Sequence, residues 1–435
     1  MKIVKKYLNA FLLDSFKILF LRLFGVGLQY LVLLFLTNNL TEELFGKYNY
    51  LTTIIIPVAA ISLLGMDNSF LQFVGKLRAQ GQESYLKKLY KNKILITIVM
   101  VVGSLILYVA LTYIFKDFFS EDRKYIYNYI AITLLPFALF ILNIQVLRGL
   151  NQLVVSELFR GVFRHGLLLL LILLAISYDK LDDIIVIFSI SIYILGVVST
   201  YQVWRSFPKI GNDLINYESI SRRQILKTSI PMSISFFSLL IMQSFDIIIL
   251  ERFYDFKVVA HYGIAIKISL IIGIVLASIN TLIAPNISSL FYENKKEELN
   301  TLVRKATSLN FVITLPIIFF VSFFSEFFLE IFGEEYVVAK SALIIILAGQ
   351  IFNAICGPVG TYLNMTGRQV VYQKVLLIAL LLNLVLNLIL IPKFGIIGSA
   401  ASTSISLMFW NITGMLIIYR KDKINSSIFG KIIIK

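Results

Sequence analysis

Long apolar runs dominate this sequence and restrict what it can fold into. Each run is about 17–25 residues or longer, which is the length that an α-helix needs to cross the hydrocarbon core of a bilayer. Backbone groups in lipid must be hydrogen-bonded internally, and a helix achieves this within one segment. We therefore expect an all-α integral membrane protein with about twelve transmembrane helices. The runs fall at residues 15–37, 50–72, 94–115, 126–148, 154–177, 183–204, 228–250, 260–288, 308–331, 338–362, 373–391 and 396–419.

The composition agrees with this class. Of the 435 residues, 58% are hydrophobic and 15% are charged, whereas soluble domains are about 45–50% apolar and 25% charged. The net charge of +15 indicates membrane topology rather than a nucleic-acid partner. Cys356 is the single cysteine, so an intrachain disulfide and a cysteine metal cluster are excluded.

The distribution of basic residues predicts the orientation. With a cytoplasmic N-terminus, the inner segments hold 26 Lys and Arg residues and the outer loops hold nine. Cytoplasmic loops of membrane proteins carry such an excess, so we expect both termini to be cytoplasmic. The longest outer loop, around Lys116–Lys124, leaves no room for a catalytic domain outside.

The two halves of the chain resemble each other. Leu36–Tyr48 aligns with Leu250–Tyr262 at an offset of 214 residues, and Gln152 aligns with Gln369 at an offset of 217. A repeat of six helices keeps its orientation, which makes the repeat parallel. We expect two six-helix lobes, residues 1–210 and 211–435, related by a pseudo-twofold axis along the membrane normal and enclosing a central cavity.

Asp246 and Lys267 lie in apolar helices on either side of one short polar turn. A charge at the centre of a bilayer costs roughly 2.5–3.5 kcal/mol on insertion scales, so such residues are candidates for a substrate or ion pathway. The alternative is an Asp–Lys pair with the structural role of locking two helices together.

More charges lie in the predicted cytoplasmic third of the membrane. Arg22 is on the first helix, and Asp67 is near the inner end of the second. Glu157, Arg160 and Arg164 are spaced i, i+3 and i+7, which puts them on one α-helical face. The arginine fork suits the oxygens of a phosphate. Alternatively, Glu157 and Arg160 neutralise each other while Arg164 reaches the interface.

The sequence lacks the common motifs of nucleotide and metal enzymes. Walker A, GxSxG, HExxH and the dinucleotide glycine pattern are all missing. We therefore expect neither an enzyme nor an ATP-driven pump, and no metal or cofactor.

Three stretches resemble a known family. Gly25–Asn49 runs into FGKYNY at residues 45–50, residues 244–268 contain SFDIIIL and AHYGIAIKI, and Leu388–Leu407 contains Pro-x-x-Gly-x-x-Gly. In these the chain resembles the bacterial polysaccharide repeat-unit flippases of the multidrug/oligosaccharidyl-lipid/polysaccharide exporter superfamily. The resemblance covers essentially the whole chain and implies a two-lobed fold of twelve or fourteen helices.

The resemblance also implies a function. Such a flippase moves undecaprenyl-diphosphate-linked oligosaccharide from the inner to the outer leaflet of the bacterial cytoplasmic membrane, for O-antigen, capsule or exopolysaccharide synthesis. Matched to this sequence, the residues of a cationic cavity for the diphosphate are Arg22, Arg160, Arg164 and Lys267. The candidates for coupling or cavity gating are Asp246, Asp67 and Glu157.

Several alternatives stay open. Coupling to a proton or sodium ion and an association with a polysaccharide polymerase are both compatible with the sequence. A cation-coupled multidrug exporter of the same fold is the main competing function. A flippase for a cell-wall precursor or a teichoic-type unit is a variant of the first. A membrane glycosyltransferase is disfavoured by the short outer loops.

Overall fold

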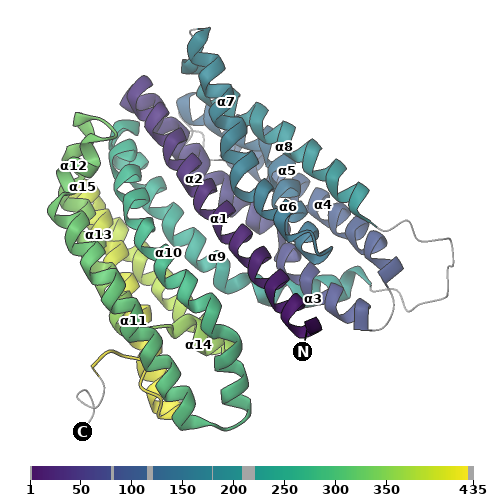
Figure 1. Cartoon of the computed structure of the whole chain (residues 1–435). Coiled ribbons are helices and arrows are strands. Elements are labelled where there is room, and N and C mark those ends of the chain that lie inside the picture. Colours follow the sequence, from purple (N-terminus) through teal and green to yellow (C-terminus); the bar gives the residue numbers. More distant parts are fainter. Residues whose placement is uncertain (1, 80–82, 115–120, 179, 208–220, 430–435) are drawn as a thin grey trace. The chain divides into compact units, whose positions relative to one another are not determined.

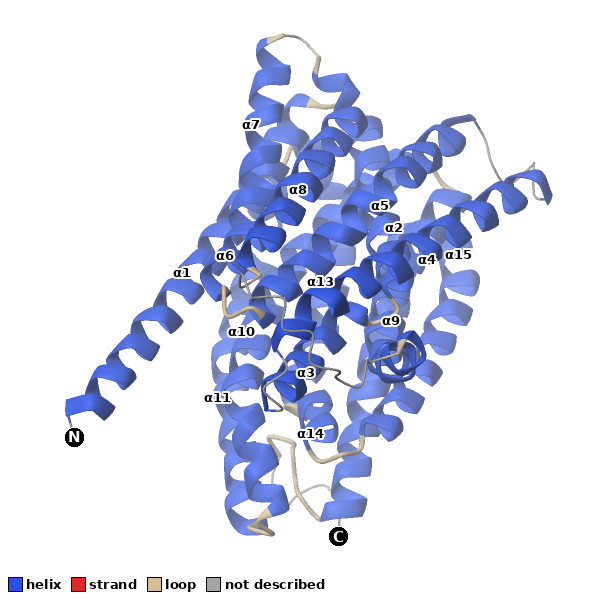
Figure 2. Ribbon diagram, turned by 90° about the vertical axis from the view of Figure 1, so that its right-hand side faces the viewer, coloured by secondary structure: helices blue, strands red, loops and turns tan. Residues whose placement is uncertain are grey.

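The computed structural model of the chain describes residues 2–79, 83–114, 121–178, 180–207 and 221–429. In these residues it contains helices and connecting loops, without a strand (Figure 2). The chain divides into two compact units, Met1–Phe237 and Ser238–Lys435. The predicted boundary between the lobes, at residues 210 and 211, lies outside the described residues. The boundaries of the two lobes, residues 1–210 and 211–435, therefore stay a prediction.

The helices of each unit can be followed in Figure 1. The first unit contains α1 (Lys2–Asn39), α2 (Glu42–Leu63), α3 (Met66–Ala79), η1 (Glu83–Tyr85), α4 (Leu86–Ile114), α5 (Glu121–Gly149), α6 (Leu153–Glu157), the π-helical segment η3 (Leu158–Phe163), α7 (Arg164–Ser177), η4 (Leu181–Asp183), α8 (Ile184–Ser206) and the first half of α9 (Arg222–Phe253). The second unit contains the rest of α9, α10 (Phe256–Tyr292), α11 (Lys296–Phe323), α12 (Ser325–Glu330), η5 (Glu334–Ala339), α13 (Lys340–Cys356), α14 (Val359–Met365) and α15 (Gln369–Asp422).

These helices account for every predicted span. Ten helical segments of the described residues are long and apolar enough to cross a membrane. One of them, α15, has 54 residues and contains both of the last two predicted spans, while α9 covers residues 228–250. The prediction of an all-α, multi-pass membrane protein with about twelve spans in two lobes is confirmed.

The turns that the internal repeat aligns are built in the same way. Thr41 accepts a hydrogen bond from the backbone N–H of Leu44 and caps α2. Asp255, the aligned residue of the second half, accepts from the N–H of Val258 at 3.0 Å and caps α10. A short side-chain oxygen at this position satisfies a backbone donor that the helix leaves free. The two halves of the repeat therefore also share the way in which α2 and α10 are capped at their N-termini.

One predicted span differs from the structure. The run at residues 50–72 is not a single helix, because α2 begins at Glu42 and ends at Leu63. Leu64 and Gly65 then have positive φ angles of 46° and 71°. A Cβ at Gly65 would lie 2.4 Å from the backbone oxygen of Ser229 on α9, so glycine is required at this break. Asp67 consequently lies in the first turn of α3 rather than at the end of the second helix.

A second predicted span, residues 338–362, is also divided. The helix α13 ends at Cys356, and Gly357 has a φ of 79°. Pro358 has no N–H to continue the helical ladder, and α14 starts at Val359. Gly357, Val359 and Gly360 at this break line a cavity of the second unit.

Candidate functional site

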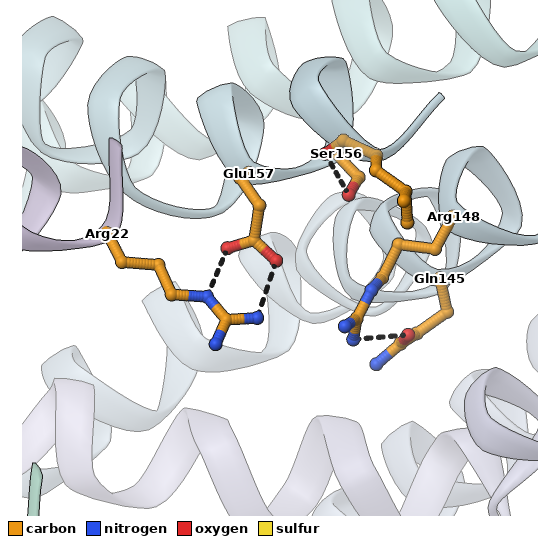
Figure 3. A network of polar contacts seen from close by, with 6 residues as sticks. Arg22, Gln145, Arg148, Ser156 and Glu157 are labelled. Carbon is orange, nitrogen blue, oxygen red and sulfur yellow. Dashed lines mark hydrogen bonds and ion pairs between the residues drawn. The ribbon is translucent and has the colours of Figure 1, made fainter. Parts of the chain in front are cut away.

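An ion pair between α1 and α6 marks the first polar site (Figure 3). The guanidinium of Arg22 donates from Nε and Nη2 to the two carboxylate oxygens of Glu157, each at 3.1 Å. The Arg22 side chain is 42% exposed, whereas that of Glu157 is 3% exposed. One partner is therefore held inside the unit while the other keeps an open face. Such a two-pronged contact fixes the orientation of both groups.

Two glycines bring these charges together. A Cβ at Gly25 of α1 would lie 2.8 Å from the Cα of Gly161 in η3. The two backbones therefore approach closely. Arg22 precedes Gly25 by about one turn, and Glu157 precedes Gly161 by about one turn. The close approach of the glycines thus places the guanidinium opposite the carboxylate.

The π-helical segment changes the predicted arrangement of this helix. The i, i+3, i+7 argument for Glu157, Arg160 and Arg164 assumes α-helical spacing, but Leu158–Phe163 is π-helical. A π turn contains more residues than an α turn, and π segments are frequent at functional sites. Glu157 is paired with α1, whereas the guanidinium of Arg164 lies 5.4 Å from the ring centre of Phe137 on α5. Arg164 is therefore directed away from Glu157, contrary to the predicted shared face.

Positive charge exceeds negative charge around Glu157. Its electrostatic neighbours are Arg22, Arg160 and Arg148, which gives three guanidinium groups against one carboxylate. Arg148 ends α5 and donates to the side-chain oxygen of Gln145 at 3.4 Å; Figure 3 shows it on the side of Glu157 opposite Arg22. We call Arg22, Arg148, Arg160 and Glu157 the arginine cluster. Arg148 stands at the end of a predicted span, so its position in the sequence does not indicate that it belongs with the others.

Asp67 has a basic neighbour that the sequence did not indicate. Lys93 of α4 is completely buried and lies within electrostatic range of Asp67. Its ammonium donates to the carbonyl of Met66 at 2.6 Å and to the hydroxyl of Ser69 at 2.7 Å. Lys93 therefore holds the start of α3 against α4. This arrangement gives Asp67 a compensating charge and fits a positioning role.

The second polar site surrounds Asp246, which is 1% exposed. Its Oδ1 accepts from the amides of Asn387 at 2.6 Å and Asn383 at 3.4 Å. Its Oδ2 accepts from the hydroxyl of Tyr262 at 3.2 Å and from that of Thr403. A carboxylate offers about four acceptor positions, so all are used. We call these five residues the aspartate cage; it ties α9 to α10 and to both halves of α15.

The cage depends on a bend within α15. Gly395 has φ 54° and ψ −131°, and Pro392 precedes it, so the helix is interrupted there. The Tyr254 hydroxyl donates to the carbonyl of Ile391, one residue before Pro392. A Cβ at Gly398 would lie 2.3 Å from the Leu390 oxygen. The Pro-x-x-Gly-x-x-Gly motif therefore makes the bend that lets Asn387 and Thr403 reach one carboxylate.

Lys267 is not part of this cage. It lies on α10 and is partly buried, and among the described residues it is neither a hydrogen-bond nor an ion-pair partner of Asp246. The alternative of an Asp246–Lys267 pair locking two helices is therefore not observed. The carboxylate is stabilised by neutral donors instead.

The asparagines of the cage were missed at the sequence level although a signal was present. Asn383 and Asn387 stand four residues apart in the apolar run LLLNLVLNLIL, and that spacing puts two amides on one helical face. Polar side chains in a transmembrane helix face the protein interior. The pair could therefore have been assigned to the inner face, although its partner Asp246 could not.

The sequence matches two family models. Residues 12–291 match the model described as polysaccharide biosynthesis protein, and residues 231–389 match the MatE model. The first match spans more than half of the chain. The chain belongs to the polysaccharide biosynthesis protein family.

Relatives in this family align over nearly the whole chain. A protein of Haloferax volcanii, named probable low-salt glycan biosynthesis flippase Agl15, is 24% identical over 404 residues, covering 90% of this chain and 80% of its own. The capsular polysaccharide biosynthesis protein CapF of Staphylococcus aureus is 25% identical over 395 residues, covering 87% and 91%.

Solved structures share the fold of this family member. An inward-facing multidrug resistance transporter of the MATE family has a TM-score of 0.74 at 15% identity, with 92% of this chain and 94% of the other covered. The lipid II flippase MurJ has a TM-score of 0.71 at 16% identity, covering 94% and 89%. At these identities the likeness establishes the fold alone.

Proposed function

We propose that this protein is a flippase for undecaprenyl-diphosphate-linked oligosaccharide repeat units in surface polysaccharide biosynthesis. It would move them from the inner to the outer leaflet of the cytoplasmic membrane, with both of its termini in the cytoplasm. The names of two relatives, a glycan biosynthesis flippase and a capsular polysaccharide biosynthesis protein, support this proposal. The observation that carries it is the arginine cluster, in which Arg22 pairs with Glu157 and two further guanidinium groups lie within electrostatic range of the same carboxylate.

The diphosphate would bind by partner exchange. Arg22 holds Glu157 with two N–H groups but keeps an exposed face. A diphosphate brings several acceptor oxygens, and arginine binds phosphate with the same fork that it uses for a carboxylate. Arg148 and Arg160 add charge at the same place. Arg164, which rests on an aromatic ring, and Lys267, which lies in the other unit, stay predicted contributors to the cavity.

The reaction would be transport without covalent chemistry. The prenyl chain would stay in lipid while the charged headgroup and sugars pass through a cavity that opens alternately to each side. A surface polysaccharide polymerase would receive the product, and this association is also a proposal.

Asp246 is our candidate for coupling to a proton or sodium ion. Its cage contains two hydroxyls, from Tyr262 and Thr403, and two amides. A hydroxyl can turn and accept where an amide N–H cannot. A protonated Asp246 would therefore be accommodated by rotating one hydroxyl, which changes how α10 or α15 is held. Glu157 and Asp67 are weaker candidates because each has a basic neighbour.

Leaflet-specific labelling tests the proposed function. Lipid-linked oligosaccharide is labelled from outside in cells with the protein, without it, and with Arg22→Ala as the sole copy. We expect the deletion to trap the glycolipid on the cytoplasmic face and Arg22→Ala to reproduce most of this effect. Arg205→Ala, an arginine of the inner end of α8 that lies over Tyr201, is a matched control and should transport normally.

A cation-coupled multidrug exporter is the second candidate. The MatE match over residues 231–389, which contains Asp246, favours it. If the deletion leaves the glycolipid distribution unchanged and makes cells sensitive to cationic dyes, the exporter replaces the flippase.

A further inference from the structure

A polar cavity lies inside the second unit, apart from the aspartate cage. It has a volume of about 200 Å³ and is lined by residues of α10, α13, α14 and α15. The side chains that give it its chemistry are Asn280, Asn353, Thr361, Asn364, Tyr372 and Trp410. None of these residues belongs to the arginine cluster or to the aspartate cage.

Two amide oxygens at this cavity are buried without a partner. Oδ1 of Asn280 and Oδ1 of Asn353 have no hydrogen-bond donor among the described protein atoms. The Asn353 amide nitrogen donates to the side-chain oxygen of Gln350 at 3.2 Å, which fixes the orientation of that side chain. Buried polar atoms are rarely left unsatisfied in proteins. Both residues line the cavity, so a molecule held there that donates hydrogen bonds would satisfy these oxygens.

The other lining groups narrow the chemistry of that molecule. None of the described residues that line the cavity is charged, so an ionic ligand would be uncompensated there. Tyr372 and Trp410 form an edge-to-face pair with ring centres 6.1 Å apart, and an aromatic face attracts polarised C–H groups. Amide, hydroxyl and aromatic groups together suit a neutral ligand with several hydroxyls and an apolar ring face.

The backbone gives this cavity its size. Gly357 has a positive φ and starts the break between α13 and α14. A Cβ at Gly360 would lie 2.6 Å from the Tyr372 hydroxyl oxygen, so the tyrosine is seated directly on α14. Pockets for drug-sized ligands measure roughly 300–1,000 Å³. The smaller volume here fits a single ring.

We propose that this cavity is a subsite for one neutral sugar ring of the lipid-linked oligosaccharide. The inference rests on the proposed function and adds a recognition site for the sugar, separate from that for the diphosphate. Asn364 is exposed at the edge of the cavity, and the predicted topology puts it at the cytoplasmic end of its span. A sugar presented at the inner leaflet would meet this end of the unit first.

Tryptophan fluorescence offers a direct test, because the chain has two tryptophans, Trp204 and Trp410. The Trp204→Phe protein, full length and in lipid nanodiscs, is titrated with methyl glycosides of glucose, galactose and N-acetylglucosamine. We expect at least one glycoside to change the Trp410 emission saturably at millimolar concentration. The reciprocal Trp410→Phe protein, which retains Trp204, should not respond.

Two variants remove hydrogen-bonding groups from the cavity while keeping its packing. Asn353→Leu keeps the approximate volume, and Thr361→Val keeps the shape but removes a hydroxyl. Each should weaken glycoside binding about tenfold, as the loss of about 1.4 kcal/mol does, while thermal unfolding and elution volume stay close to those of the parent. Mannitol, a linear polyol, is the control ligand and should give no saturable response.

The outcomes separate the subsite from the flippase function. An unsaturable response, an equal response to mannitol, or folded variants that bind as the parent does would each overturn the sugar subsite. If binding is absent while deletion of the protein traps glycolipid, the subsite fails and the flippase function stands. Glycoside binding combined with normal glycolipid distribution in the deletion strain overturns the proposed function and the assignment to a lipid-linked substrate.

Discussion

The arginine cluster and the aspartate cage handle charge in a membrane protein in opposite ways. Glu157 is balanced by guanidinium groups, and its main partner, Arg22, is 42% exposed. Asp246 is 1% exposed and accepts hydrogen bonds from uncharged side chains. The first site has surplus charge and an open side, whereas the second has used all its acceptor positions.

This difference indicates what each site can do. A partly exposed ion pair contributes little to stability. Arg22 can therefore exchange the carboxylate of Glu157 for another negatively charged group, such as a diphosphate, at low cost. A buried carboxylate with four donors is expensive to disturb, because each donor left unsatisfied costs about 1–3 kcal/mol. The cluster is suited to binding and release, and the cage is suited to holding helices until an ion changes its charge.

Removing the carboxylate of the cage should have the largest effect on stability. Asp246→Ala leaves buried donors without an acceptor, and we expect the apparent Tm in detergent to fall furthest for this variant. Asp246→Asn keeps one acceptor oxygen and should fall between the alanine variant and the parent. Glu293→Gln is the control, because Glu293 is exposed and its loss leaves no buried donor without an acceptor. Hydrogen bonds from Lys295 and Ser289 hold the pKa of Glu293 below its usual value, so this carboxylate also has donors. Equal Tm values for Asp246→Ala and the control would contradict the cage.

The bend of α15 gives the next largest effect. In Gly398→Ala the new methyl group meets the backbone oxygen of Leu390 at 2.3 Å, which no side-chain rotation relieves. Overpacking of this kind costs about 1–3 kcal/mol. Gly273→Ala, where a Cβ meets nothing within 4 Å, should unfold at or slightly above the parent temperature. The measurement is the Tm of the two variants under the same conditions. Equal Tm values for Gly398→Ala and Gly273→Ala would show that the bend tolerates a side chain.

The position of the arginine cluster should depend on Gly25 of α1 but not on Gly27 of the same helix. Gly25→Ala forces α1 away from η3, because the added Cβ would be 2.8 Å from the Cα of Gly161. We expect a stability loss of about 1 kcal/mol together with reduced glycolipid transport. Gly27→Ala adds the same group on the same helix, where it meets nothing within 4 Å, and should be neutral in both assays. Loss of transport in both variants would instead point to a general intolerance of α1.

Breaking the Arg22–Glu157 pair should have the smallest effect on stability. The exposed face of Arg22 screens the interaction, so a double-mutant cycle with Arg22→Ala and Glu157→Gln should give a coupling energy of about 1 kcal/mol or less. The measurement is thermal or denaturant unfolding of the four proteins. A coupling energy as large as the effect of Asp246→Ala would remove the contrast between cluster and cage.

Much of this fold could be predicted from the sequence because lipid leaves few options. The lengths of the apolar runs predicted twelve helices, and each has a helical counterpart in the structure. Two of the errors lie where a glycine has a positive φ, and a third is the run at residues 308–331, which divides at Phe324 between α11 and α12. Gly65 and Gly357 end helices inside apolar runs, and hydropathy does not report backbone conformation.

The sites were harder to predict because their contacts are distant in the sequence. Arg22 and Glu157 are 135 residues apart, and Asp246 and Asn387 are 141 apart. Each residue was recognisable as a polar group in an apolar helix, with the exceptions of Arg148 and Lys93, which stand at predicted helix ends. What could not be derived was the pairing, since it depends on the π-helical segment and on the bend at Gly395.

The arginine cluster is the proposed recognition site for the diphosphate. Its most direct test is the binding of undecaprenyl diphosphate and of uncharged undecaprenol to the purified full-length protein in nanodiscs, for the parent and for Arg22→Ala and Arg148→Ala. We expect the parent to prefer the diphosphate, and each variant to lose about tenfold in affinity for it, since hydrogen bonds to charged groups contribute about 1.5–3 kcal/mol. Binding of undecaprenol should not change. Equal affinity of the parent for both lipids, or diphosphate binding unchanged in both variants, would contradict the account.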